Sequence, residues 1–165
     1  MNLRQQIIKA FEHRALPTRL IVYDFAITFE YEEALWFSGR SWQEIRWQDW
    51  QEYSCALYAF TPEAFVYYLP SVLSSALDKP DEWLDAVDSL LCLLDRNQEP
   101  QNWDDFMTER LVGLEEGEYK VLKDWIFFIS ESNMYYDEEA MLRCYQTLDL
   151  IESETIRIRN SDIHK

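Results

Sequence analysis

The sequence predicts an all-α fold, and three observations support this prediction. Only three glycines and five prolines occur in 165 residues, whereas β sandwiches and barrels need many tight turns. Apolar residues recur at helical spacing along most of the chain, and capping residues precede several of these stretches. We therefore expect a single compact domain of about seven or eight helices over residues 1–153, followed by a polar C-terminal tail over 154–165 that frays.

The N-terminal elements are predicted from their apolar residues. Residues 2–13 form an amphipathic helix, because one face of the pattern holds Leu3, Ile7, Ile8 and Phe11. Residues 19–29 are rich in β-branched and aromatic side chains but have no clear period. This composition leaves two alternatives open for residues 20–29, a short strand or an extended packed segment.

A glycine and a capping box set the helix boundaries in the next stretch. A helix over 30–38 is expected to end at Gly39, since glycine adopts the left-handed conformation that often follows a helix. Ser41 and Glu44 have capping-box spacing and predict the start of another helix. That helix contains three tryptophans that we expect to pack inward or across an interface: Trp42, Trp47 and Trp50.

A further helix start lies at Thr61, Pro62 and Glu63. The threonine can cap the helix, the proline suits the first helical position, and the glutamate complements the positive end of the helix dipole. Pro70 lies inside the apolar pattern that follows. Because proline removes a backbone hydrogen bond, we expect it to kink this helix or divide it.

Four more helices are predicted, over 81–95, 102–112, 118–131 and 138–152. The first of them carries an apolar stripe that begins at Trp83. The third is apolar on nearly all faces, which is typical of a central helix. Asp137 is the predicted N-cap of the last helix, whose inner stripe consists of Met141, Tyr145, Leu148 and Ile151.

The charge of the chain is strongly negative and unevenly distributed. Thirty-one acidic residues against fifteen basic ones give a formal charge of −16. Residues 78–139 hold eighteen acids and five bases, a net charge of −13, whereas residues 1–19 have a net charge of +3. Aromatic residues make up 16% of the chain, so the acids belong to a folded domain and not to a disordered tail. Such a domain is suited to meet a basic partner.

The composition argues against several functional classes. The two histidines, His13 and His164, lie far apart in the sequence without paired ligands, which argues against a metal site or a nucleophilic triad. Three glycines cannot build a phosphate-binding loop. Paired carboxylates are expected from the composition alone, and the negative charge would repel nucleic acid. We expect a protein that is not an enzyme and that has no cofactor, no metal and no direct contact with nucleic acid or membrane.

The cysteines and apolar stretches bear on the compartment. Cys55, Cys92 and Cys144 are too few and too far apart for a disulfide framework or a zinc motif, so we expect buried free thiols in a reducing compartment. The N-terminus has no secretory pattern, and the apolar stretches are shorter than the ~20 residues that span a membrane. These features predict a cytoplasmic protein.

The remaining candidates are surface patches for a protein partner. The first is the acidic run 115–118 with the acids at 104 and 105; the same acids also stabilise helix N-termini through the dipole. The second is 132–139, where tyrosines adjoin acids; a loop anchored by one buried tyrosine is the alternative. The predicted partner-binding residues are Trp103, Asp104, Asp105, Glu115, Glu116, Glu118, Tyr135, Asp137, Glu138 and Glu139.

Two resemblances add to this interpretation. Residues 60–70 (FTPEAFVYYLP) follow an upstream block at 39–45 (GRSWQEI). Together they resemble a family of small uncharacterised bacterial proteins that share a TPEAF-x-YYLP block after a G-x-x-W-x-E-I block. The likeness covers roughly residues 30–77 and implies no catalytic residues. In general character the chain also resembles the immunity proteins of bacterial toxin systems, which are small, acidic, single-domain inhibitors.

Three functional hypotheses follow. The leading one is an immunity protein of a toxin system, such as contact-dependent growth inhibition, that covers the active cleft of a basic nuclease toxin. The alternative is an acidic nucleic-acid mimic or adaptor that acts on a host DNA-binding protein. A third is an enzyme of unrecognised type, which would require a deep pocket with perturbed carboxylates.

Overall fold

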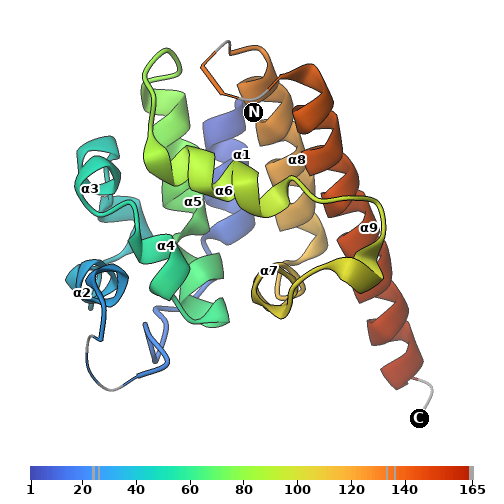
Figure 1. Cartoon of the computed structure of the whole chain (residues 1–165), viewed down its shortest axis with the longest axis horizontal. Coiled ribbons are helices and arrows are strands. Elements are labelled where there is room, and N and C mark those ends of the chain that lie inside the picture. The colour runs from blue at the N-terminus through green and yellow to red at the C-terminus, as the bar shows by residue number, and fades with distance from the viewer. Residues whose placement is uncertain (24, 26, 133, 136, 164–165) are drawn as a thin grey trace.

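Five helices of the described chain pack against the central helix α5, while α2 packs on α4 and α9 packs on α8 and α6 (Figure 1). The computed structural model describes residues 1–23, 25, 27–132, 134–135 and 137–163, with side chains as far as residue 155. Within these ranges there are nine α-helices, two 3₁₀ turns and no strand, which confirms the all-α prediction. The elements are α1 (Leu3–Phe11), α2 (Phe29–Trp36), η1 (Trp42–Glu44), α3 (Trp47–Glu52), α4 (Ala56–Ala59), α5 (Pro62–Asp78), α6 (Asp85–Leu94), η2 (Pro100–Asn102), α7 (Asp105–Leu111), α8 (Glu116–Ser130) and α9 (Glu138–Ile163).

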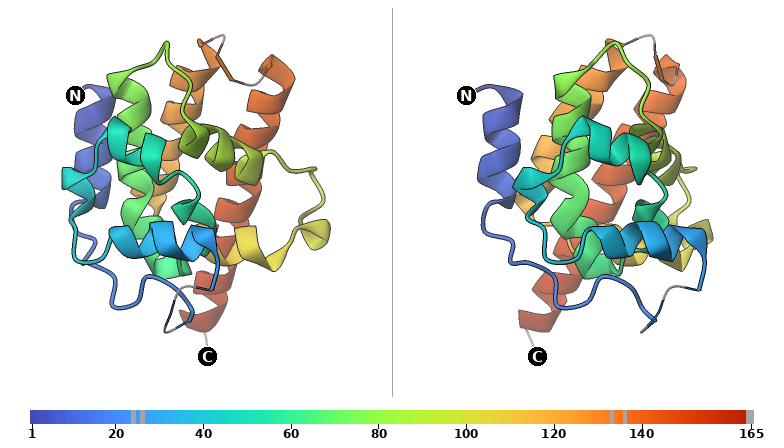
Figure 2. Two further views of the ribbon diagram at one scale, coloured as in Figure 1. Left: turned by 60° about the vertical axis from the view of Figure 1, so that its left-hand side comes forward. Right: turned by 90° about the vertical axis from the view of Figure 1, so that its left-hand side faces the viewer.

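Helix α5 forms the centre of the fold because it is apolar around most of its circumference. It contacts α1, α3, α6, α7 and α8, and Figure 2 shows these helices around it. The predicted start is confirmed, since the Thr61 side chain accepts a hydrogen bond from the Ala64 amide at 3.2 Å. Pro70 lies within α5, which continues to Asp78 as one element. The helix is therefore not divided at the proline.

The block at 60–70 has a structural role in the fold. Tyr68 is buried in α5, and its hydroxyl donates to the carbonyl of Phe37 at 2.8 Å and lies 2.9 Å from that of Arg40. These contacts hold the turn at Gly39, whose φ of 72° is the left-handed conformation predicted for it. Arg110 donates to the Phe60 carbonyl at 2.5 Å and so joins α7 to the start of α5.

The tryptophan-rich stretch is buried but is not one helix. The predicted capping box at Ser41 is present, yet it opens only the 3₁₀ turn η1 before α3 begins at Trp47. The division allows three side chains to turn inward, and Trp50 donates to the Ser71 hydroxyl of α5 at 2.9 Å. All three tryptophans are buried, as predicted: Trp42, Trp47 and Trp50.

The segment that precedes α2 forms no strand among its described residues and bends at residues 22, 23, 25 and 28. Ile21 pairs with Phe60 in an isolated antiparallel bridge, and the Thr61 amide donates to the Leu20 carbonyl at 2.8 Å. Neither alternative predicted for residues 20–29, a short strand or an extended packed segment, is observed in full: among the described residues only Ile21 forms a strand-like pairing, and the chain beyond it bends, with residues 24 and 26 outside the described ranges. Beyond Ile21 the described large side chains of this segment are exposed.

The C-terminal helix is longer than predicted. Helix α9 runs to Ile163, so residues 154–163 have a helical backbone where a frayed tail was expected. Helices α8 and α9 lie side by side and run in opposite directions (Figures 1 and 2). Asp137 caps α9 as predicted, because its carboxylate accepts from the Ala140 amide at 2.8 Å. In the described part of the chain, no helix is both long enough and apolar enough to cross a membrane.

Candidate functional site

The predicted partner-binding residues lie in three separate places. They surround the first turns of α7, α8 and α9. Because α8 connects the second place with the third, these two are about 20 Å apart at 1.5 Å per residue. The ten residues therefore do not form one patch.

At the start of α7 the predicted residues are engaged locally. The Trp103 indole donates to the Asn97 carbonyl at 2.9 Å. Asp104 is the N-cap of α7 and lies 3.2 Å from the Arg96 guanidinium. Asp105 is exposed in the first turn of α7. This cluster of one cation with two acids carries little excess charge.

At the start of α8 the prediction for Glu118 is wrong. Its carboxylate is buried and paired with Arg14, whose Nε donates to it at 2.7 Å and whose Nη2 forms a second contact. The hydrogen bond to Glu118 raises the pKa of Arg14. Glu118 also closes the capping box with Glu115. The carboxylate of Glu115 lies 3.3 Å from the His13 imidazole. Of the three predicted acids at the start of α8, Glu115 and Glu116 are exposed and Glu118 is not. Glu118 joins the segment after α1 to α8 and is not available to a partner.

The third place is built by two loops that are hydrogen-bonded to each other. The Tyr135 hydroxyl accepts from the Leu84 amide and donates to the Glu82 carbonyl, both at 3.2 Å. Its ring stacks on Trp83 with centroids 5.0 Å apart. The Ser132 hydroxyl donates to the Pro80 carbonyl at 3.3 Å. The predicted alternative of a loop anchored by one buried tyrosine is thus half right, since Tyr135 is half-buried and anchors both loops.

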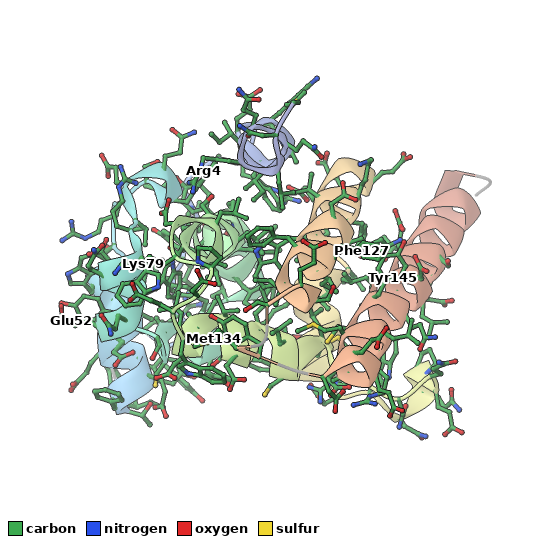
Figure 3. All side chains as sticks on the ribbon, turned by 90° about the horizontal axis from the view of Figure 1, so that it is seen from above. Arg4, Glu52, Lys79, Phe127, Met134 and Tyr145 are labelled. Carbon is green, nitrogen blue, oxygen red and sulfur yellow. The ribbon has the colours of Figure 1, made fainter. Side chains whose placement is uncertain are left out.

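These loops collect a large share of the acidic charge. We call this region the acidic end; Figure 3 looks down on it, with Lys79 and Met134 labelled. Eight acids and one lysine give it a formal charge of −7; the acids are Asp81, Glu82, Asp85, Asp88, Glu131, Asp137, Glu138 and Glu139. Seven of the acids are exposed, and Asp88 is partly buried. The lysine lies over the Trp47 ring and 3.1 Å from Glu82.

The electrostatics of the acidic end follow from this crowding. Burial raises the pKa of Asp88, and the neighbouring carboxylate of Asp85 raises it further. Burial also raises the pKa of Tyr135, to which the charges of Asp88 and Asp85 contribute. The field of the α6 acids therefore reaches the stacked pair of Tyr135 and Trp83. Trp83 is 44% exposed, so the apolar stripe predicted to begin there starts later, within α6.

An apolar groove adjoins the acidic end. It lies between α8 and α9, has a volume of about 540 Å³, and is lined by Ile126, Phe127, Ser130, Glu138, Glu139, Met141, Leu142 and Tyr145. Phe127 and Leu142 are 61% and 56% exposed. Figure 3 shows Phe127 and Tyr145 between the two helices, with ring centroids 5.3 Å apart. The expectation that α8 is central on all faces is therefore wrong at Phe127.

Three exposed apolar residues of this region were not predicted as binding residues: Trp83, Phe127 and Leu142. A signal for Phe127 was present, because the run at 125–129 (WIFFI) has more apolar side chains than one buried face can cover. Leu142 is adjacent to the predicted stripe of α9 but is not part of it. Trp83 carried no comparable signal, since its exposure depends on where α6 begins.

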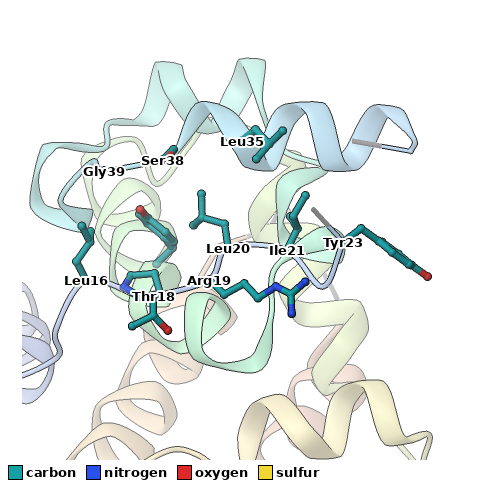
Figure 4. Close-up of a pocket in the computed structure, with 11 residues that line it drawn as sticks. Leu16, Thr18, Arg19, Leu20, Ile21, Tyr23, Leu35, Ser38 and Gly39 are labelled. Carbon is teal, nitrogen blue, oxygen red and sulfur yellow. The ribbon is translucent and has the colours of Figure 1, made fainter. Parts of the chain in front are cut away.

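A second pocket, of about 230 Å³, lies between residues 16–23 and α2 (Figure 4). Its polar side chains hold the backbone: Arg19 donates to the Val22 carbonyl at 2.6 Å, and Tyr68 is held as described above. Burial raises the pKa of Tyr68, which keeps its hydroxyl protonated. Within the described chain, the residues that line this pocket include no carboxylate, histidine or cysteine.

The thiols differ from the expectation that all are buried. Cys144 is buried, and burial raises its pKa to about 12. Cys55 is partly buried and Cys92 is exposed, so the prediction is wrong for Cys92. As far as the chain is described, no three histidine, cysteine or acidic side chains are close enough to hold a metal ion.

Comparison with known proteins gives one match. Residues 1–147 match the sequence pattern of a family of unknown function, DUF6714. No curated protein and no solved structure matches the chain.

Proposed function

The chain belongs to the DUF6714 family, whose function is unknown, and we propose that it is an immunity protein. In this proposal it acts in the cytoplasm, as part of a toxin system such as contact-dependent growth inhibition. It binds a cognate basic toxin of the nuclease class and covers the active cleft. The acidic end takes the place that the nucleic acid would occupy.

One observation carries this proposal: acidic residues and exposed aromatic surface occur together at the acidic end. A formal charge of −7 surrounds the stacked pair of Trp83 and Tyr135. Charge of one sign accelerates encounter with an oppositely charged cleft. Aromatic side chains buried in the complex then slow dissociation. Both parts are needed for an inhibitor, because charge alone gives fast but short-lived binding.

The arrangement of the loops supports a preformed binding surface. Tyr135 is bonded to the backbone at Glu82 and Leu84 and stacked on Trp83 before any partner arrives. Ordering these side chains therefore costs little on binding. Two cations of the basic N-terminal region are paired within the molecule, since Arg4 contacts Asp78 at 2.5 Å and Arg14 contacts Glu118. They do not offset the charge of the acidic end.

The direct test is genetic and biochemical. The reading frame next to this gene is expressed in cells with and without this protein, and the two purified products are mixed. We expect growth only when both are present, and a stable complex whose formation suppresses the nuclease activity of the neighbour. Failure to protect, together with no complex between the purified proteins, would contradict the proposal.

The alternative of a nucleic-acid mimic or adaptor uses the same surface but a different partner. It predicts a host DNA-binding protein as the target and no toxic neighbouring gene. Cells that lack the neighbouring gene would then still show an effect of this protein on a host DNA-binding activity.

A further inference from the structure

We propose that the groove between α8 and α9 binds an amphipathic helix of the partner, with apolar side chains in the groove and lysines or arginines beside it. The inference rests on the proposed function, because it takes the partner to be the basic toxin. It adds a defined apolar contact to the charged surface of the acidic end.

The apolar part of the groove consists of side chains from both helices. Phe127 comes from α8, and Leu142 and Tyr145 come from α9. Phe127 and Leu142 expose more than half of their surface to solvent. Phe127 meets Tyr145 edge to face, which fixes the position of both rings. Exposed apolar side chains gathered in a groove with a polar rim mark a protein-binding surface.

The groove continues along α8 and α9 as a charged hollow, and we call the groove and the hollow together the seam. This second hollow has a volume of about 440 Å³ and shares Tyr145 with the groove. Lys120 contacts Asp124 at 2.7 Å. Lys123 contacts Glu152 at 2.6 Å and also pairs with Asp149. Both lysines of the seam are therefore neutralised by acids of this chain.

The charge of the seam selects the kind of occupant. The acids that line it or pair with its lysines are Glu116, Asp124, Glu138, Glu139, Asp149 and Glu152. Set against two lysines, these six acids leave a formal charge of −4. A second copy of this chain, with its charge of −16, would meet repulsion here. A segment with lysines or arginines gains attraction instead.

The shape of the seam favours a helix as the occupant. Two antiparallel helices leave a straight groove into which the ridge of a third helix packs. The seam extends from the acids at the start of α9 to Glu116 at the start of α8. This length of about 20 Å accommodates about four helical turns. Helices that bind in such grooves place apolar anchors three or four residues apart.

The test uses defined peptides and the full-length protein. The probe is an 18-residue peptide with leucines on one helical face and lysines elsewhere. Two control peptides replace every lysine by glutamate or scramble the order of the leucines and lysines. Binding is measured by titration calorimetry. We expect the leucine–lysine helix to bind at least tenfold more tightly than either control peptide.

Matched variants locate the binding surface. Phe127→Ser and Leu142→Ser change the groove, whereas Phe29→Ser and Leu35→Ser change exposed apolar side chains of α2, where Phe29 is 62% exposed. We expect each groove variant to weaken binding of the helical peptide about tenfold or more and each α2 variant to change it less than twofold. Circular dichroism confirms that the variants are folded; a misfolded variant is replaced by Phe127→Thr or Leu142→Thr.

Two results would contradict the proposal that the groove binds a helix. One is equal binding of the helical and scrambled peptides, which would mean that charge alone is recognised. The other is that the groove variants and the α2 variants weaken binding of the helical peptide equally, or that neither pair of variants weakens it. The same variants are then tested against the neighbouring gene product. If the groove variants still protect cells from the neighbouring gene product, the groove proposal is contradicted and the immunity proposal is not. If the groove binds the helical peptide but the neighbouring gene product is not toxic, the immunity proposal is contradicted and the groove proposal is not.

Discussion

At the scale of single residues, Glu118 differs in role from Glu115 and Glu116. The Glu118 carboxylate is buried and bonded to Arg14, whereas the other two are exposed. All three lie in the same acidic run, and the sequence pattern treats them alike. The difference arises because Arg14, which follows α1, is about one hundred residues away from Glu118 in the chain. A contact of this range is invisible to local spacing, which is why Glu118 was wrongly predicted as a binding residue.

The buried pair of Glu118 and Arg14 gives the first prediction. Glu118→Gln removes the charge that Arg14 faces and leaves a partly buried guanidinium without its partner. We expect a loss of roughly 3 kcal/mol in the free energy of unfolding, measured by urea denaturation. Glu116→Gln is the control, since Glu116 is exposed in the same helical turn, and it should change the stability by less than about 0.5 kcal/mol. Equal effects of the two substitutions would rule out the structural role of Glu118.

At the scale of elements, the helix starts that depend on a local cap were predicted correctly. The helix lengths that depend on packing against other elements were not. The caps at Thr61 and Asp137 were correct because a cap and its amide lie within three residues. The division of the tryptophan-rich stretch into η1 and α3 was missed, because it depends on the approach of α5. The exposure of Trp83 was missed because it depends on where α6 begins: the helix starts at Asp85, so Trp83 precedes it and is not part of its buried stripe.

A titrating contact between elements gives a second prediction. Glu33 of α2 accepts from the Cys55 amide at the start of α4 at 2.8 Å, and burial raises the pKa of its carboxyl above the ordinary value of 4.5. The folded chain therefore holds this proton more tightly than the unfolded chain. It follows that the contribution of Glu33 to stability is present below pH 4.5 and is lost as the pH rises through the folded pKa.

The variant Glu33→Gln isolates this contribution, because the amide can accept the same hydrogen bond and does not titrate. We expect the stability of the variant relative to the natural chain to increase between pH 4 and pH 7. Urea denaturation at several pH values measures the difference, and the other titrating groups cancel in it. A difference that stays constant, or that favours the natural chain as the pH rises, is inconsistent with a raised pKa.

At the scale of the whole molecule, the excess of acid is polarised. The net charge of −16 was evident from composition, and so was its concentration in residues 78–139. The composition does not show that the loops at 79–85 and 131–139 bring their acids together. Nor does it show that the acids near the start of α8 lie at the opposite end of that helix. The acidic end combines a formal charge of −7 with a preformed aromatic pair and an adjoining groove. The start of α7 also has a stacked pair, Tyr58 and Phe106, beside a pocket, but there Arg96 offsets the charge of Asp104.

The measurement that tests this account most directly is the association rate with the cognate toxin for two matched double variants. Glu138→Lys with Glu139→Lys reverses charge at the acidic end, and Glu32→Lys with Asp105→Lys reverses the same charge elsewhere. All four acids are exposed in the first turn of a helix, so the cost to the helix dipole is similar. At low salt we expect the first pair to slow association about tenfold and the second to slow it less than about threefold. Equal slowing by both pairs would mean that only the net charge matters, and it would contradict the acidic end as the binding surface.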